Sequence, residues 1–398
     1  MSDLRKTVLG LHAKRSGSVA TPQSFIPTKW TKYFDKEEQI QIPNGTFNLY
    51  SRGKKGPILL CLHGGGYSGL TWALFAEEIM ELINCQVIAL DLRGHGKTTT
   101  NDDADLSLNT LSNDVLEVAS KISEEKKDPI ILVGHSMGGA VAVETANSLE
   151  SAIGLCVIDV VEGTALDALS SMQSILRGRP SHFKSIPHAI QWCYKGGQTH
   201  NLEAAKVSMP GQVINVKTEN LAADECDNID PQAIESLMNQ RSTAGSMNSL
   251  TEVAEESEEI EDSEKYNDCG KPPLPKSQRT DLFKSPTSMN SEDVPQYKWR
   301  IDLSKTEKFW TGWFKGLSQK FLGIHVPKLL LLANIHGLDT ALTVGQMQGK
   351  FQMQVLAKSG HAIHEDQPHK VAEVMSGYLV RQQLATGKDS FVHQEHVD

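Results

Sequence analysis

Residues 130–140 read Ile-Ile-Leu-Val-Gly-His-Ser-Met-Gly-Gly-Ala, so a β-branched run ends in the pattern Gly134-x-Ser136-x-Gly138. Residues 141–149 follow with a helical pattern, which gives the order strand, sharp turn, helix, with a serine at the turn. A serine in such a turn has a strained backbone, and the residues two before and two after it must be very small. The following helix directs N–H groups at the serine, where negative charge develops in acyl transfer. The stretch predicts a serine hydrolase with Ser136 as nucleophile.

Apolar runs typical of buried strands lie on both sides of this turn, and helix-length segments separate most of them. They cover residues 58–62, 86–92, 129–133, 154–160, 328–333 and 351–356, after a hairpin at 39–51. This alternation predicts an α/β fold with a doubly wound, mostly parallel sheet. The alternation of strands and helices stops after the sixth strand, where several amphipathic helices follow one another. We interpret these helices as a cap over an active site; the alternative is a plain helical insertion.

The acidity of the chain is concentrated in one segment. The net charge is −10, but residues 219–294 alone contain 18 acidic and 6 basic residues. This segment is poor in aromatic residues and has too little apolar surface to offset the entropy cost of ordering. We therefore expect this order: a disordered tail at 1–22, the first part of the core at 23–162, a helical cap at 163–218, an acidic disordered insertion at 219–294, an aromatic-rich cap helix region at 295–324, the second part of the core at 325–384, and a tail at 385–398.

Composition excludes several classes of protein. Without the acidic segment the chain is near neutral, whereas nucleic-acid binding requires a basic face. The chain shows no signal-peptide pattern and no apolar run of membrane-spanning length, so we expect no membrane association. Its six cysteines are scattered without a C-x-x-C pair, which indicates buried thiols in a reducing, cytoplasmic compartment. No metal-ligand cluster is apparent, and we expect no cofactor.

A serine nucleophile requires a base and an orienting acid. His361 follows the last predicted strand within Gly360-His361-Ala362, and we interpret it as the base, with His364 as the fallback. Two residues are candidates for the orienting acid. Asp339 follows the next-to-last predicted strand, whereas Asp159 ends the strand after the turn helix, in an apolar run where it needs a partner.

The oxyanion hole is expected to use the N–H groups of Met137 and Gly65. Gly65 belongs to the loop His63-Gly64-Gly65-Gly66-Tyr67, which lacks the Lys-Ser/Thr ending of a phosphate-binding loop. Gly64, Gly66, Tyr67 and His135 are the candidate substrate-binding residues. The turn at residues 91–97 is expected to be structural rather than reactive.

These residues resemble a known family. The turn at 134–139, the glycine loop at 63–66 and residues 91–96 resemble the α/β-hydrolase superfamily. Residues 158–164, 299–313 and 343–353 are more specific and resemble the protein phosphatase methylesterases, a resemblance that extends from about 27 to 380. It implies an esterase that removes the methyl group from the C-terminal leucine carboxyl of the protein phosphatase 2A catalytic subunit. It also implies Ser136, His361 and Asp159 as the triad, and a nuclear pool beside the cytoplasmic one.

The acidic insertion suggests a second contact with the phosphatase. Leu250, Val253 and Glu255 lie in a stretch that resembles the Leu-x-x-Ile-x-Glu motif bound by phosphatase 2A regulatory subunits, although a solvated run of charge is an equal alternative. Two other functions remain open: a generic carboxylesterase acting on small esters, and a binding protein that sequesters inactive phosphatase. The scaffold subunit of the phosphatase is a further candidate partner.

Overall fold

The computed structural model of the chain describes residues 25–226, 296–334 and 338–388. Its centre is a sheet with the strand order β1-β2-β5-β3-β7-β8-β12-β13, and the short β6 pairs with β2. The strands from β5 to β13 are parallel, and the β1–β2 hairpin joins them antiparallel. The predicted doubly wound, mostly parallel sheet is confirmed, and a helical segment follows β8, the sixth strand of this path in chain order.

The strands of the sheet lie close to the predicted ranges, and α3 begins four residues before the predicted helix at 141–149. The strands are β1 (Lys36–Ile42), β2 (Gly45–Arg52), β3 (Ile58–Leu62), β5 (Gln86–Leu90), β6 (Thr99–Thr100), β7 (Ile130–His135), β8 (Ala152–Ile158), β12 (Lys328–Leu332) and β13 (Gln352–Val355). The helices are α1 (Ala73–Leu82), α2 (Leu108–Lys126), α3 (Met137–Ala146), α10 (Leu317–Gly323), α11 (Thr340–Met347), α12 (Ile363–Asp366) and α13 (Pro368–Arg381).

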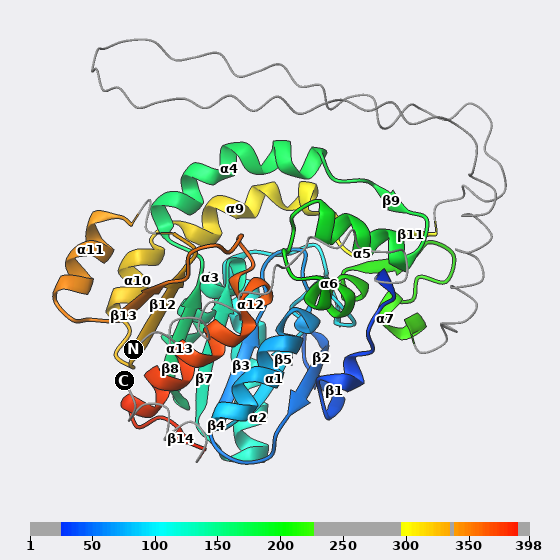
Figure 1. Cartoon of the computed structure of the whole chain (residues 1–398). Helices are drawn as coiled ribbons and strands as arrows, with labels where there is room; N and C mark the ends of the chain where they lie inside the picture. The colour runs from blue at the N-terminus through cyan, green and yellow to red at the C-terminus, as the bar shows by residue number, and fades with distance from the viewer. Residues whose placement is uncertain (1–24, 227–295, 335–337, 389–398) are drawn as a thin grey trace, which may run out of the picture. The chain divides into compact units, whose positions relative to one another are not determined.

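The central strands are buried on both faces because helices cover both. Alternate residues of β3 belong to different cores: Leu60 packs with residues of α2 and α3, whereas Leu59 and Cys61 pack with residues of α1 and α13. This division explains why the parallel strands are continuous apolar runs instead of alternating patterns. The carboxyl ends of these strands, where loops carry functional residues, lie beneath the helices α4 and α9 (Figure 1).

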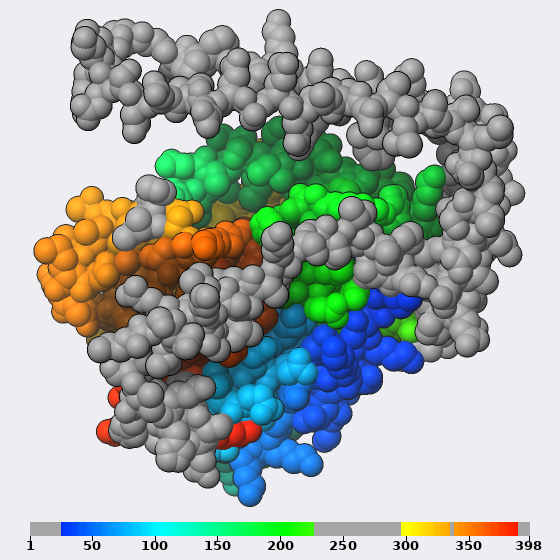
Figure 2. Space-filling model, in the orientation of Figure 1, coloured from blue at the N-terminus to red at the C-terminus, as the bar shows by residue number. Residues whose placement is uncertain are grey.

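The segment after β8 forms a cap with its own core. It contains α4 (Glu162–Arg177), β9 (His182–Phe183), α5 (Ile186–Lys195), α6 (Leu202–Ser208), β10 (Val213–Asn215), α7 (Ala222–Glu225), β11 (Tyr297–Trp299) and α9 (Glu307–Phe314). Strands β10, β11 and β9 form a small antiparallel sheet, which joins residues on both sides of 227–295. The aromatic residues Trp310, Trp313 and Phe314 of α9 are buried in the core that also contains residues of α2 and α3, so this helix packs onto the main domain. In Figure 2 the green cap residues lie directly beside the orange residues that follow β12.

Two predicted segment boundaries differ from the described structure. Residues up to Cys226 are described, and α7 with the buried Leu221 packs onto the cap although the acidic insertion was expected to begin at residue 219. The backbone bonds Asn215 N–H to Asn220 O and Glu219 N–H to Asn215 O hold this end in place. In the expected C-terminal tail, β14 (Thr386–Gly387) pairs with β4 (Ile83–Asn84). Leu250, Val253 and Glu255 lie outside the described residues.

No helix in the described ranges is long and apolar enough to cross a membrane. The five cysteines in these ranges are buried, and no disulfide joins any two of them. Burial in the apolar core raises the pKa of Cys61 and Cys156, which keeps both thiols protonated.

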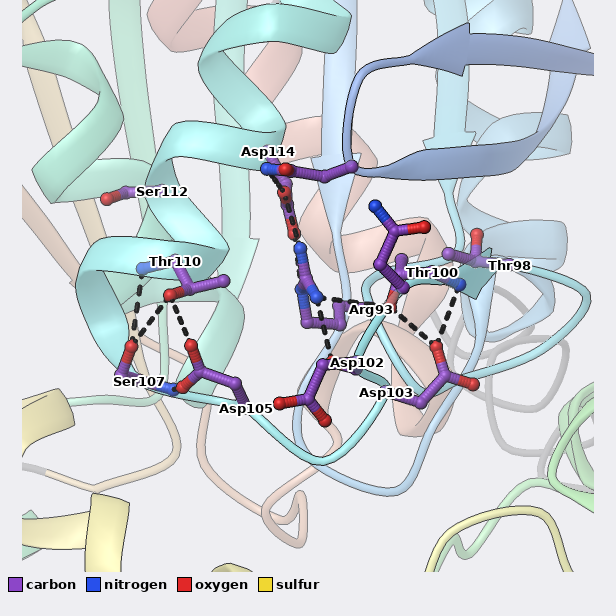
Figure 3. A network of polar contacts seen from close by, with 12 residues as sticks. Arg93, Thr98, Thr100, Asp102, Asp103, Asp105, Ser107, Thr110, Ser112 and Asp114 are labelled. Carbon is purple, nitrogen blue, oxygen red and sulfur yellow. Dashed lines mark hydrogen bonds and ion pairs between the residues drawn. The ribbon is translucent and has the colours of Figure 1, made fainter.

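A buried ion pair supports the turn that follows β5 (Figure 3). Arg93 donates from Nε and a terminal nitrogen to the two carboxylate oxygens of Asp114 on α2, at 2.7 and 2.9 Å. It also donates to the carbonyl of Asp102 at 2.8 Å. Nearby, Asp103 accepts from Thr100 and from Arg300 of the cap. The predicted structural turn thus connects the core with the cap.

We expect Arg93→Ala to lower the free energy of unfolding by about 3–5 kcal/mol, because Asp114 would be left as a buried charge without its partner. Urea denaturation followed by circular dichroism measures this change. Lys305→Ala is the control, because the pair of Lys305 with Asp302 is exposed and should contribute less than about 1 kcal/mol. Equal effects of the two variants would contradict the prediction.

Candidate active site

The turn between β7 and α3 has the strained conformation expected for a nucleophile. Ser136 has φ 53° and ψ −121°. A Cβ on Gly134 would lie 2.3 Å from the carbonyl oxygen of Gly138, and one on Gly138 would lie 2.4 Å from that of Leu62. Both positions therefore require glycine, which is the physical reason for the spacing read in the sequence.

The structure brings Asp159 and His361 together. Asp159 directly follows β8 with φ 51°, and its Oδ2 accepts a hydrogen bond from His361 Nδ1 at 2.8 Å. Its Oδ1 accepts from Ala333 N–H at 2.9 Å. Burial alone would raise the pKa of Asp159, but these bonds lower it below its ordinary value. A charged Asp159 orients His361 so that Nε2 can accept a proton.

The loop that carries His361 is held from two sides. Gly360 N–H donates to Asp366 Oδ2 at 2.6 Å, and Asp366 Oδ1 also accepts from the N–H of His200 in the cap, at 2.6 Å. From below, His135 Nε2–H donates to the carbonyl of His361 at 2.9 Å. The side chain of Ser136 has no hydrogen-bond partner among the described residues, although Ser136 and His361 line the same two cavities. Bonds between a nucleophile and its base are often long before a substrate binds.

His364 and Asp339, the alternative candidates for base and acid, interact with residues other than His361. His364 is fully buried, its ring is stacked on Trp72 at 4.3 Å, and its Nε2 is 2.8 Å from Thr71 Oγ1. Burial lowers the pKa of His364 to about 3, so it is neutral at physiological pH. Asp339 accepts from Leu342 N–H as the N-cap of α11 and also from Ser318. Neither side chain contacts His361 in the described structure.

The glycine loop lies against the nucleophile. A Cβ on Gly64 would lie 3.2 Å from that of Ser136, and one on Gly65 would lie 3.8 Å from Met137 Sδ. Gly66 N–H donates to His95 Nε2 at 2.9 Å, whereas the N–H groups of Gly65 and Met137 have no acceptor among the described residues. Both N–H groups lie in the loops beside Ser136, and they remain the predicted oxyanion donors.

Two cavities meet at Ser136 and His361. The smaller, of about 250 Å³, extends toward Asp159. The larger, of about 760 Å³, extends beneath the cap and is lined by the candidate residues Gly65, Tyr67 and Met137 and also by Arg179, which the sequence reasoning missed. Both share Met172 and Phe314. The missed side chains lie on cap segments whose packing over the serine has no local signal in the sequence.

His135 differs from its predicted role as a substrate-binding residue. Its side chain is fully buried, and the T-shaped contact with Tyr67, at 5.7 Å between ring centroids, lies behind the cavity wall. Burial lowers the pKa of His135 well below its ordinary value, so the ring is neutral. His135 supports the loop of His361 from the core, and Gly64 and Gly66 shape the loop without lining either cavity.

A buried carboxyl group continues this polar core. Glu365 is fully buried, and its Oε1 accepts from Thr71 Oγ1 at 2.5 Å. Burial raises the pKa of Glu365 from 4.5 to about 7. The folded protein therefore binds the proton of Glu365 more tightly than the unfolded chain does, and this difference stabilises the fold. Its contribution to the free energy of unfolding is complete below about pH 4.5 and is lost as the pH rises through about 7.

We expect the free energy of unfolding to fall by about 2–3 kcal/mol more between pH 5 and 8 in the natural protein than in Glu365→Gln, which cannot titrate. Urea denaturation at both pH values measures the difference. Glu373→Gln, an exposed carboxyl on α13, is the control and should keep the natural pH dependence. The same pH dependence in Glu365→Gln as in the natural protein would show that Glu365 does not titrate in this range.

Comparison with known proteins identifies the family. Residues 59–212 match the model of the alpha/beta hydrolase family. The protein phosphatase methylesterase 1 of Bos taurus is 46% identical over 369 residues, which cover 91% of this chain and 88% of that protein. The human protein of the same name is also 46% identical, and a probable one from Caenorhabditis elegans is 39% identical, with 87% and 79% of their lengths covered. This chain belongs to the protein phosphatase methylesterase 1 family.

As a member of the protein phosphatase methylesterase 1 family, the protein is an ester hydrolase with the α/β-hydrolase fold. Solved structures agree on the fold. E-2-(acetamidomethylene)succinate hydrolase superposes with a TM-score of 0.58 at 14% identity, over 87% of this chain and 99% of its own. A Mycobacterium tuberculosis esterase superposes with a TM-score of 0.53 at 17% identity, over 87% of this chain and 92% of its own. The family resemblance read from the sequence is confirmed.

Proposed function

We propose that this protein is a serine carboxylesterase that demethylates the methyl-esterified C-terminal leucine of the protein phosphatase 2A catalytic subunit. The observation that carries the proposal is the His361–Asp159 hydrogen bond of 2.8 Å beside two cavities that both reach Ser136. The names of the relatives support a protein phosphatase as the substrate. The assignment to phosphatase 2A and to its leucine rests on the family resemblance of the sequence.

In the first half of the reaction, His361 Nε2 accepts the proton of Ser136 as Oγ attacks the ester carbonyl carbon. The carbonyl oxygen becomes an anion, which accepts hydrogen bonds from the N–H groups of Met137 and Gly65. The C–O bond to the methoxy group then breaks, and methanol leaves with the proton from His361. Asp159 stabilises the positive charge that His361 carries in between.

In the second half, His361 removes a proton from water, which attacks the acyl-enzyme carbonyl. Collapse of this intermediate breaks the bond to Ser136, returns the proton to Oγ and releases the free leucine carboxylate. The leucyl side chain requires an apolar site, and Met172, Leu169 and Phe314 line the smaller cavity beside Ser136. The larger cavity accommodates the preceding residues of an extended tail.

The proposal is tested by measuring hydrolysis of three substrates: the intact methylated phosphatase catalytic subunit, a methylated tail peptide and a small chromogenic ester. We expect rapid turnover of the intact subunit and slower turnover of the other two. Hydrolysis of the small ester without any demethylation of the phosphatase would contradict the proposal and favour a generic carboxylesterase. Tight binding of phosphatase without turnover would favour the sequestering role.

A further inference from the structure

Arg179 is the one arginine or lysine among the described residues that line the larger cavity. Arg179 follows α4 and is half-buried, with its guanidinium carbon 4.3 Å from the ring centroid of Trp299 and 5.8 Å from that of Trp192. Trp299 is itself held by a hydrogen bond of 2.8 Å from its Nε1 to the carbonyl of Pro180. Stacking on these rings restricts the guanidinium to one plane, so that its N–H edge faces a defined direction.

The N–H edge of Arg179 lies close to the glycine loop at residues 63–67, which carries the proposed oxyanion donor Gly65. A Cβ on Gly66 would lie 3.6 Å from a terminal nitrogen of Arg179. The other terminal nitrogen donates to Gln198 Oε1 at 3.4 Å, and Gln198 is held in turn by its bond to Gln212 at 2.7 Å. Arg179 is therefore built into the cavity wall and is not a surface side chain that folds over it.

The charge of Arg179 has no counter-ion in the described part of the chain. No aspartate or glutamate among the described residues lines the larger cavity, and the titratable groups that act on the pKa of Arg179 are Tyr67 and Cys193. Most of the remaining lining is apolar and includes Leu303, Trp310 and Trp313. An arginine presents five N–H donors in a planar fork that matches a carboxylate, and one of them is used by Gln198. The site is thus complementary to an anion that enters with a ligand.

The chemistry of the proposed substrate limits which part of it can supply the anion for Arg179. A methylated C-terminus is a neutral ester, so the reacting group itself brings no negative charge to the cavity. We propose that Arg179 is a specificity-determining residue that binds an acidic side chain of the substrate tail, upstream of the methyl-esterified residue. This inference rests on the proposed function, because it assumes that a peptide tail enters the larger cavity.

The test uses two tail-peptide methyl esters that differ only by aspartate or asparagine at an upstream position, with the aspartate moved along the peptide in a series. Their affinities are measured by fluorescence polarisation with Ser136→Ala protein, which binds without turnover. We expect one position at which the aspartate peptide binds about 10- to 100-fold more tightly than its asparagine counterpart. The preference should disappear in Ser136→Ala/Arg179→Gln, and Arg179→Lys should restore part of it.

Two controls separate this role from a structural one. Arg177→Gln changes an exposed arginine of α4 that lines neither cavity, and it should keep the preference for aspartate. Ser136→Ala/Arg179→Gln should bind the asparagine peptide within about 3-fold of the affinity of Ser136→Ala, because the neutral amide forms no ion pair with Arg179. A large loss of affinity for the asparagine peptide would show that Arg179 supports the site itself and would overturn the inference.

Equal affinities for the aspartate and asparagine peptides at every position would overturn the inference. So would an Arg179-dependent preference for the demethylated peptide over its ester, because Arg179 would then bind the product carboxylate. Neither result depends on turnover. Failure of the proposed function would instead appear as an absence of demethylation by the natural enzyme in the three-substrate experiment.

Discussion

Ser136→Ala should lower kcat for ester hydrolysis by about 10⁴- to 10⁶-fold, on the small ester and on the methylated phosphatase alike. The serine oxygen forms the bond to the acyl carbon in the proposed mechanism, and alanine offers no atom that replaces it. The oxyanion donors and the cavity remain, so a small residual rate above that in water is expected. Release of the chromophore from the small ester and of methanol from the methylated phosphatase measures the loss.

The same variant separates catalysis from binding. Alanine lacks only the hydroxyl, so the cavities and the cap surface stay intact, and binding to the phosphatase should be unchanged in a pull-down or by calorimetry. A melting temperature close to that of the natural protein confirms that the turn still folds. Retention of more than a few per cent of the activity would contradict the assignment of Ser136 as nucleophile.

Asp159→Asn should lower kcat by roughly 10⁴-fold, because an amide cannot stabilise the imidazolium and favours the wrong tautomer of His361. In the structure, Asp159 Oδ2 accepts from His361 Nδ1, and its pKa is held below the ordinary value, so it is charged at neutral pH. Replacement by asparagine keeps the shape of the side chain but removes that charge. Steady-state kinetics with the small ester, across a range of pH, measures the effect.

Asp339→Asn is the matched control, since Asp339 is the alternative acid considered from the sequence. Asparagine is as good an N-cap as aspartate, so α11 should remain folded and activity should stay within a few-fold of natural. A large loss in Asp339→Asn with little loss in Asp159→Asn would reverse the assignment of the acid.

Local patterns in the sequence predicted much of the fold. The strand–turn–helix at Ser136 was predictable because glycine, serine and β-branched residues constrain the backbone within a few positions. The buried strands were predictable because a parallel strand covered on both faces is a continuous apolar run. The end of the cap was placed too early because Leu221 becomes buried only through contacts with the rest of the cap.

The sequence predicted a site residue only where that residue lies at the end of a predicted strand, because the ends of parallel strands meet at one edge of the sheet. The sequence by itself determined that Ser136 stands at a sharp turn, with His361 and an aspartate available at the ends of parallel strands. The local pattern left Asp159 and Asp339 open as the acid, and the family resemblance favoured Asp159, which meets His361 in the structure. Only the tertiary structure decided that His135 lies in the core and that Arg179 reaches the cavity. The hydrogen bonds of His361 with Asp159 and with His135 join residues 202 and 226 positions apart, so their approach depends on packing of whole elements rather than on the preferences of neighbouring residues.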